Sequence, residues 1–517
     1  MVEVEDTRAE AGDRGFVRMG EPRGRWVLLA SILGSSLVMI DATVVNVALA
    51  AIGRDLDSDM AGLQWTVNGY TLTLASFILL GGALGDEYGR RRVFVVGIVW
   101  FALASVLCGL APSIELLVAG RVLQGVGGAL LTPGSLAIIS ASFHPDDRGK
   151  AIGAWSGLGG IAAAVGPFLG GWLVMVDWHL IFLVNVPLSA IAVAVALRHV
   201  PESRDEQQEV VRGLAGLDLA GAALGAIGLG GVTAALIQAG SGSLLVPVGG
   251  VVGVVALVAF VLVERRERHP MLPLDIFASR QFTVANVATF AVYAALGGVL
   301  FLLVVHLQVV SGYTPLAAGT ALLPLTALML LLSSRAGALS QRIGPRLPMA
   351  AGPLVCAVGM LLFLRIGRDA SYLLDVLPGV VVFGLGLSLT VAPLTTTVLA
   401  AADERHAGVA SGVNNAVARA AGLLAVAVLP ALIGLTGEAY RDPAAFDVAF
   451  GRAAWIGAGL LAAGGLVSAL WISNDVVARR PAPAPDHTHR DPDECVHCAL
   501  DAPPLAAQRR HRSRRAA

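Results

Sequence analysis

The chain has 517 residues, of which 56% are hydrophobic and 14% are charged, whereas a soluble domain carries about 25% charged residues. Its formal net charge is −1, which implies no acidic or basic partner and no nucleic acid. With a mean hydropathy of +0.74, this composition excludes an ordinary soluble protein and predicts an all-α integral membrane protein.

Apolar blocks of about 17 to 28 residues recur along the chain, and each is long enough to form one membrane-spanning helix. We count fourteen such blocks. A similar stretch of sequence occurs twice, beginning at Gly82 after the second block and at Gly337 after the tenth. This repetition indicates that the chain consists of two related halves. The blocks cover residues 26–49, 63–84, 93–112, 116–140, 151–175, 180–198, 216–238, 246–263, 283–308, 316–338, 348–366, 373–399, 408–436 and 450–472.

Basic residues beside the spans predict the orientation, because Arg and Lys accumulate on the cytoplasmic side of membranes. With the N-terminus inside, 29 basic residues lie on the inner side and 5 on the outer side. We therefore expect both termini in the cytoplasm and the first span to stay in the membrane. The predicted organisation is a tail at 1–25, a six-helix bundle at 26–198, a linker with two extra spans at 199–282, a second six-helix bundle at 283–473 and a disordered tail at 474–517.

Asp41 and Arg121 are ionisable residues inside apolar spans, where each costs about 2.5–3.5 kcal/mol on insertion scales. Their depths in the first and fourth spans allow the guanidinium to reach the carboxylate, and Gln124 lies one turn beyond Arg121. A carboxylate held between burial and a nearby cation can change protonation near neutral pH, as proton coupling requires. The alternative is a structural ion pair, which apolar packing could replace at little cost.

Five motifs in chain order resemble the signature motifs of the major facilitator superfamily. With fourteen spans, the chain resembles the drug/proton antiporter branch of the EmrB/QacA type from about Trp26 to Trp471. The resemblance implies the major facilitator fold, with two six-helix bundles and a linking pair. The motifs are Asp41-Ala-Thr-Val-Val-Asn-Val-Ala-Leu, Gln64-Trp65 with Tyr70-Thr-Leu, Gly82…Asp86…Gly89-Arg90-Arg91-Arg92, Arg121-Val-Leu-Gln124-Gly125-Val-Gly127 and Gly166-Pro167-Phe-Leu-Gly170-Gly171.

The resemblance also assigns roles. It makes Asp41 and Arg121 the proton-coupling pair, and it makes the loop after the second span a conformational gate on the inner side. Glu87 departs from the family pattern, which has a basic residue there. The alternative for the loop arginines is that they only mark topology. The gate residues are Gly82, Asp86, Gly89, Arg90 and Arg91.

The fifth span carries small residues and a proline, and their spacing by itself indicates close helix packing with a bend. The resemblance adds an association with antiport and with control of leak. The residues are Gly153, Gly166, Pro167, Gly170 and Gly171.

Polar and aromatic residues in both halves are candidates for a substrate cavity: Trp65, Tyr70, Gln124, Gln308, Asn414, Asn415 and Arg419. The alternatives are packing for the aromatic residues, and pairing between helices for the asparagines and Arg419. Thr43, Asn46 and His306 are expected to form hydrogen bonds between helices instead.

No GxxxxGK phosphate loop occurs, so we do not expect ATP to drive the protein, and we expect no cofactor. The spans hold no Ser/His/Asp or multi-His constellation, so an enzyme is not expected. Cys495 and Cys498 form a CxxC pair near His487, His489 and His497 that could hold zinc. We favour incidental composition and expect no metal site.

Together these features predict a monomeric antiporter of the bacterial inner membrane. It would export amphipathic, cationic or neutral organic compounds in exchange for protons, by exposing a central cavity alternately to each side. One alternative keeps the fold but narrows the cargo to a self-made metabolite, antibiotic or lipid. Another is a membrane metal sensor that uses the Cys/His tail.

Overall fold

The computed structural model describes residues 16–203, 218–239, 245–267, 272, 274–401 and 407–474. All of them belong to one compact unit. The tail from residue 475 onward, with its Cys and His residues, lies outside the described residues. Within the described ranges the chain is helical, apart from an isolated bridge between Val17 and Phe143.

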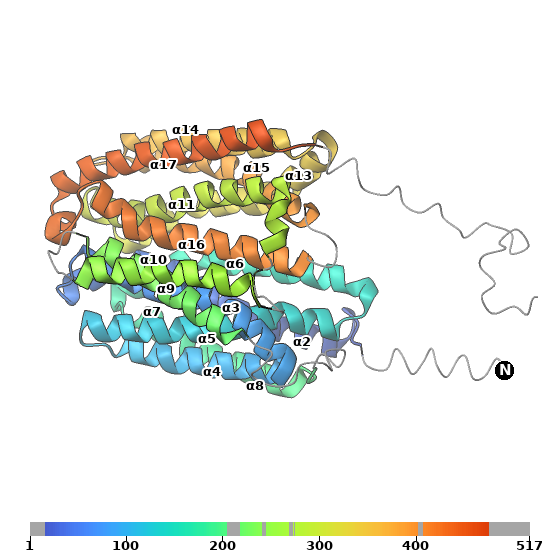
Figure 1. Cartoon of the computed structure of the whole chain (residues 1–517). Helices are drawn as coiled ribbons and strands as arrows, with labels where there is room; N and C mark the ends of the chain where they lie inside the picture. The colour runs from blue at the N-terminus through green and yellow to red at the C-terminus, as the bar shows by residue number, and fades with distance from the viewer. Residues whose placement is uncertain are drawn as a thin grey trace, which may run out of the picture. The chain divides into compact units, whose positions relative to one another are not determined.

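The first half of the unit, defined as α2 to α8, contains six spans (Figure 1). The last of these spans is interrupted between α7 and α8. The helices are α2 (Pro22–Asp55), α3 (Met60–Tyr88), α4 (Arg90–Gly109), α5 (Ile114–Ser142), α6 (Pro145–Val176), α7 (Leu180–Leu183) and α8 (Asn185–His199).

Two linking helices, α9 (Leu219–Ile237) and α10 (Leu245–Glu264), pack against each other, and α9 also contacts α3 and α16. The second half, defined as α11 to α17, again contains six spans, one of which is divided into α12 and α13. Its helices are α11 (Arg280–Val309), α12 (Pro315–Thr320), α13 (Leu323–Ile343), α14 (Arg346–Leu362), α15 (Leu377–Ala400), α16 (Ala407–Leu432) and α17 (Pro443–Trp471).

Thirteen helices among the described residues are long and apolar enough to cross a membrane. The number becomes fourteen when the two parts of α3, Met60–Ile78 and Leu80–Tyr88, which are bent by 49°, are taken as one span. The bend falls beside Gly81 and Gly82, and glycine pairs are a common cause of helix kinks. The predicted all-α membrane fold is confirmed.

Polar residues between the spans set where the helices begin and end. The side chains of Asp59, Ser113 and Ser279 each accept a backbone hydrogen bond from the first turn of the next helix, which satisfies an amide that would otherwise lack a partner. Gly89 ends α3 and begins α4 with φ of +106°, a conformation that favours glycine. The connection between α3 and α4 is therefore very short.

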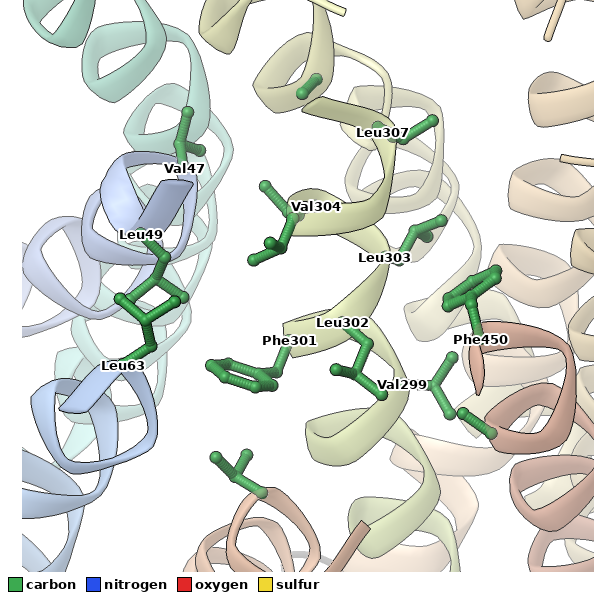
Figure 2. Close-up of a cluster of buried hydrophobic side chains, with 14 of the residues drawn as sticks. Val47, Leu49, Leu63, Val299, Phe301, Leu302, Leu303, Val304, Leu307 and Phe450 are labelled. Atoms are coloured by element: carbon green, nitrogen blue, oxygen red, sulfur yellow. The ribbon is translucent and has the colours of Figure 1, made fainter. Parts of the chain in front are cut away.

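The buried core is joined at one end of the unit and divided at the other. We call the end where α2 begins and α17 finishes the termini end, and the opposite end the far end. One large cluster combines residues of both halves, among them Leu49, Leu63, Phe301 and Val304 (Figure 2). A second cluster, around Phe94 and Phe143, belongs to the first half, and a third, around Phe282 and Val398, belongs to the second half and its flanks.

Candidate functional site

The most deeply buried charges among the described residues form an ion pair between α2 and α5. Arg121 Nη1 lies 2.6 Å from Asp41 Oδ2, and each residue is only 1% exposed. Arg121 Nε also donates to the carbonyl of Thr66 in α3, at 3.0 Å. The pair therefore connects three helices of the first half.

Neutral polar side chains complete the network around the carboxylate. Gln124 Nε2 donates to Asp41 Oδ1 at 2.8 Å and to Ser105 Oγ at 2.9 Å. Asn185 Nδ2, at the start of α8, donates to the same Asp41 oxygen at 3.2 Å. Arg121 in turn donates to Gln124 Oε1. The Asp41 carboxylate therefore accepts from three side chains, of which Arg121 is charged and Gln124 and Asn185 are neutral.

Aromatic rings cover the guanidinium. The Arg121 guanidinium carbon lies 4.3 Å from the centre of the Tyr70 ring and 5.7 Å from that of Phe182, and both distances suit cation–π contact. The hydroxyl of Tyr70 is buried and has no hydrogen-bond partner. Gly125 permits this arrangement, because a Cβ there would collide with the backbone carbonyl of Tyr70.

The stability of this ion pair depends on both of its charges. In a low-dielectric interior the attraction between the two charges is strong, and removal of one charge leaves the other buried without a partner. Loss of the Asp41 charge would therefore leave Arg121 without its ionised partner. Ser105, Asn185 and Phe182 were not predicted, because single polar or aromatic residues in apolar spans carry no motif.

The gate loop is bound to a carboxylate beyond α8. Arg91 donates its backbone amide to Glu202 Oε1 at 3.1 Å, and the side chains of Arg91 and Arg92 each lie 3.6 Å from Glu202 Oε2. Asp86 pairs with Arg90 at 2.8 Å inside the loop. These contacts involve only the first half and the segment that directly follows α8. Gly82 packs against Pro133 of α5.

Replacement of Glu202 tests the gate. We expect Glu202→Gln to keep the bond to the Arg91 amide but to weaken both ion pairs by about 0.5–1 kcal/mol, because the groups are partly exposed. This should change the initial transport rate by about two- to fivefold. Transport measured in vesicles, with the exposed Glu115→Gln as matched control, checks the prediction. An unchanged rate would show that the loop arginines only set the orientation of the chain in the membrane.

At the far end, hydrogen bonds join the two halves directly. Gln64 of α3 donates to the carbonyls of Val426 and Ala427 in α16, at 2.7 and 3.0 Å. Gln308 of α11 donates to the carbonyl of Val47 in α2, at 2.9 Å. We call these hydrogen bonds between the halves the far-end seal, and Gln308 belongs to it.

A short segment before α17 strengthens the seal. Arg441 donates to Asp57 Oδ1 and to the carbonyl of Gly53, each at 2.9 Å. The Tyr440 hydroxyl donates to the Ser58 carbonyl at 2.8 Å. Burial raises the pKa of Tyr440, which keeps the phenol protonated as a donor. The far end is therefore closed by paired polar groups as well as by the shared core.

The small residues of α6 lie at helix contacts. A Cβ on Gly166 would collide with Thr43, and one on Gly170 would lie 2.9 Å from Val44 Cγ1, both on α2. A Cβ on Gly171 would lie 2.5 Å from Leu316 Cα of α12, in the other half. Pro167 O lies against Gly319 of α12. Gly153 has no neighbouring atom in the space where a Cβ would stand.

Two of the predicted interhelical bonds are wrong. The Thr43 hydroxyl donates to the carbonyls of Met39 and Ile40, and Asn46 donates to that of Ala42, all within α2. Such back-bonding satisfies a polar side chain within its own helix. His306 fits the expectation, because its Nε2 lies 3.1 Å from Asp447 Oδ1 of α17.

A polar cavity of about 330 Å³ lies in the second half. Its walls include Thr395 and Leu399 near the end of α15 and Ser411 near the start of α16, so it lies toward the termini end. Asn414, Asn415 and Arg419 of the predicted cavity set line it together with Tyr293. Asn414 also donates to Thr289 Oγ1 at 2.7 Å.

The remaining candidates lie elsewhere. Tyr70 and Gln124 belong to the Asp41 network, and Trp65 is half-buried in α3, outside the walls of the cavity.

A helical membrane protein whose halves close on each other at one end, with a polar cavity nearer the other end, has the architecture of an alternating-access transporter.

Comparison with known proteins agrees with this class. The family model described as Major Facilitator Superfamily matches residues 31–426. The chain is 36% identical to the multidrug resistance protein Stp of Mycobacterium tuberculosis, over 80% of this chain and 77% of that protein. It is 34% identical to the tetracenomycin C resistance and export protein of Streptomyces glaucescens, over 81% and 78%.

A solved structure supports the fold. The crystal structure of a bacterial homolog of the human lysosomal transporter Spinster superposes with a TM-score of 0.63 at 18% identity, covering 90% of this chain and all of that one. The chain therefore belongs to the major facilitator superfamily, as the motifs predict. It is a multi-pass membrane transporter rather than an enzyme.

Proposed function

We propose that this transporter exports small amphipathic organic compounds across the bacterial cytoplasmic membrane in exchange for protons, with both termini in the cytoplasm. The observation that carries the proposal is the buried Asp41–Arg121 pair, with its carboxylate bonded by Gln124 and Asn185. The relatives named as resistance and export proteins support the direction and the kind of cargo.

In the proposed cycle the described conformation faces the cytoplasm, because the far end is closed and the polar cavity lies toward the termini end. Substrate binds from the cytoplasm and the halves rock to open the far end. A proton from outside then neutralises Asp41, frees Arg121 and favours return to the cytoplasm-facing state. Release of the proton inside restores the pair. One charge moved through 100 mV supplies about 2.3 kcal/mol.

Roles for the other residues follow from the same cycle. Gly82, Asp86, Gly89, Arg90 and Arg91 form the gate at the termini end. Gly166 and Gly170 allow α6 to pack closely on α2, and Gly171 and Pro167 allow it to meet α12 of the other half at the far end, which limits proton leak. We further propose that the units at 26–198 and 283–473 rock as two bundles about the linking pair, and that one chain is a complete transporter.

Vesicles test the proposed function directly. In liposomes, transporters inserted inside-out have their extracellular face toward the lumen, so export by these molecules carries dye into the liposome. Purified protein should therefore drive uptake of amphipathic dyes when the lumen is acidic. A protonophore should reduce uptake to the level of protein-free liposomes. Uptake that is unchanged by the protonophore would remove proton exchange from the account.

A narrower cargo is the second candidate. It keeps the mechanism and assigns one self-made antibiotic as substrate, and the relative named as a tetracenomycin C export protein favours it. A panel of chemically unrelated dyes and antibiotics distinguishes the two. Saturable exchange with many of them supports broad export, whereas exchange with one scaffold supports the dedicated exporter.

A further inference from the structure

We propose that the cavity of the second half binds an anionic group of the substrate on Arg419. The inference rests on the proposed export function and names the chemical class of its cargo. It departs from the cationic or neutral cargo expected from the sequence, because the cavity contains a positive charge that has no carboxylate partner among the described residues.

Arg419 is a largely buried cation without an acidic partner among the described residues. Its Nε is buried and has no hydrogen-bond partner. The titratable side chains near it are two tyrosines, Tyr70 and Tyr293, and no described carboxylate is among them. By contrast, Arg121 is paired with Asp41. A charge inside a membrane protein without a partner is costly, so it is expected to have a functional counterion.

The cavity wall is the second observation. Ser411, Asn415 and Arg419 are spaced four residues apart along α16 and share one face of the helix. Arg419 lies about 18 Å along the axis from the start of α16, near the middle of the membrane. Thr395 adds a hydroxyl from α15, and the described wall contains no acidic residue.

These groups can recognise a carboxylate or another delocalised organic anion. The planar guanidinium presents paired N–H donors that match a carboxylate, and the hydroxyl and amide groups beside it supply further donors. Val398 and Leu399 line the same cavity and can contact an apolar body. The geometry therefore points to an amphipathic anion whose charged end meets Arg419.

The position of Tyr70 connects this cavity to the proton site. Its ring lies 4.3 Å from the Arg121 guanidinium, and it is also one of the two tyrosines near Arg419. An anion on Arg419 therefore changes the field at the Asp41 pair. Export of an anion in exchange for a proton is favoured by a membrane potential that is negative inside, because both charge movements run with that potential.

Three probes of similar shape test the charge preference: naphthylacetate, naphthylacetamide and naphthylethylammonium. We expect the purified transporter to bind the carboxylate about ten- to a hundredfold more tightly than the amide. Arg419→Gln should abolish this preference, whereas Arg419→Lys should retain part of it. Arg365→Gln, a half-exposed arginine outside the cavity, should leave the preference unchanged.

Equal or tighter binding of the amide or the ammonium probe by the native protein would overturn the proposal. So would a carboxylate preference that survives Arg419→Gln. If Arg419→Gln fails to fold, the relative affinities of the three probes for the native protein and for Arg419→Lys still test the proposal. Proton-driven transport of the ammonium probe, without carboxylate preference, would refute the anion site and leave the proposed function intact. A carboxylate preference without proton-driven transport would support the anion site and refute the proposed proton exchange.

Discussion

Asp41→Asn is expected to abolish transport driven by a proton gradient. Asparagine keeps an oxygen that can accept from Gln124 and Asn185, but it cannot gain or lose a proton. Efflux against a concentration gradient in vesicles should therefore fall to the level of protein-free controls. The exposed Asp369→Asn is a matched control, since Asp369 has φ of +58° and asparagine tolerates that conformation.

The same variant leaves Arg121 buried without its partner, which costs about 3–5 kcal/mol in comparable pairs. A loss of transport could therefore reflect misfolding. The double variant Asp41→Asn/Arg121→Gln removes both charges and resolves this point. We expect it to regain thermal stability without regaining proton-driven transport. Recovery of both would identify the pair as a structural link between α2 and α5.

Gly171→Leu is expected to stop transport by keeping the far end open. A Cβ at Gly171 would stand 2.5 Å from Leu316 Cα, which is backbone and cannot move aside as a flexible side chain can. The contact joins the two halves in the described conformation, in which that end is closed. Closure should therefore fail, although each half can still fold.

Spin labels at Arg54→Cys and Glu438→Cys, one on each half at the far end, measure this effect. The distance between them should increase in Gly171→Leu, and efflux should fall to background. Gly459→Leu is the matched control, because the space beside Gly459 is open. A distance distribution equal to that of the native protein would show that the α6–α12 contact does not control closure.

Much of the fold could be predicted because membranes impose simple rules on sequence. Each span needs a long apolar block, and the motifs at Asp41, Arg121 and Gly166 carry enough specific residues to indicate the family. The bend in α3 and the breaks between α7 and α8 and between α12 and α13 were not predicted, because apolar composition continues across them.

The site could be predicted in part. Asp41, Arg121 and Gln124 stand out as polar residues in apolar spans, and the structure brings them into one network. Glu202 and Asn185 could not be predicted as partners, because they lie far along the chain and belong to no motif. The sequence analysis predicts Gln308 as a cavity residue, yet it bonds to Val47, since sequence does not reveal which face of a helix meets the other half.

In the proposed cycle Asp41 gains and loses a proton as the transporter works. Infrared difference spectra of the native protein and Asp41→Asn, recorded across pH with and without bound substrate, isolate the signal of this carboxyl group. We predict a protonated carboxyl band that is absent from the variant and whose midpoint pH shifts when substrate binds. A carboxylate band that persists at every working pH, with and without substrate, would contradict the account.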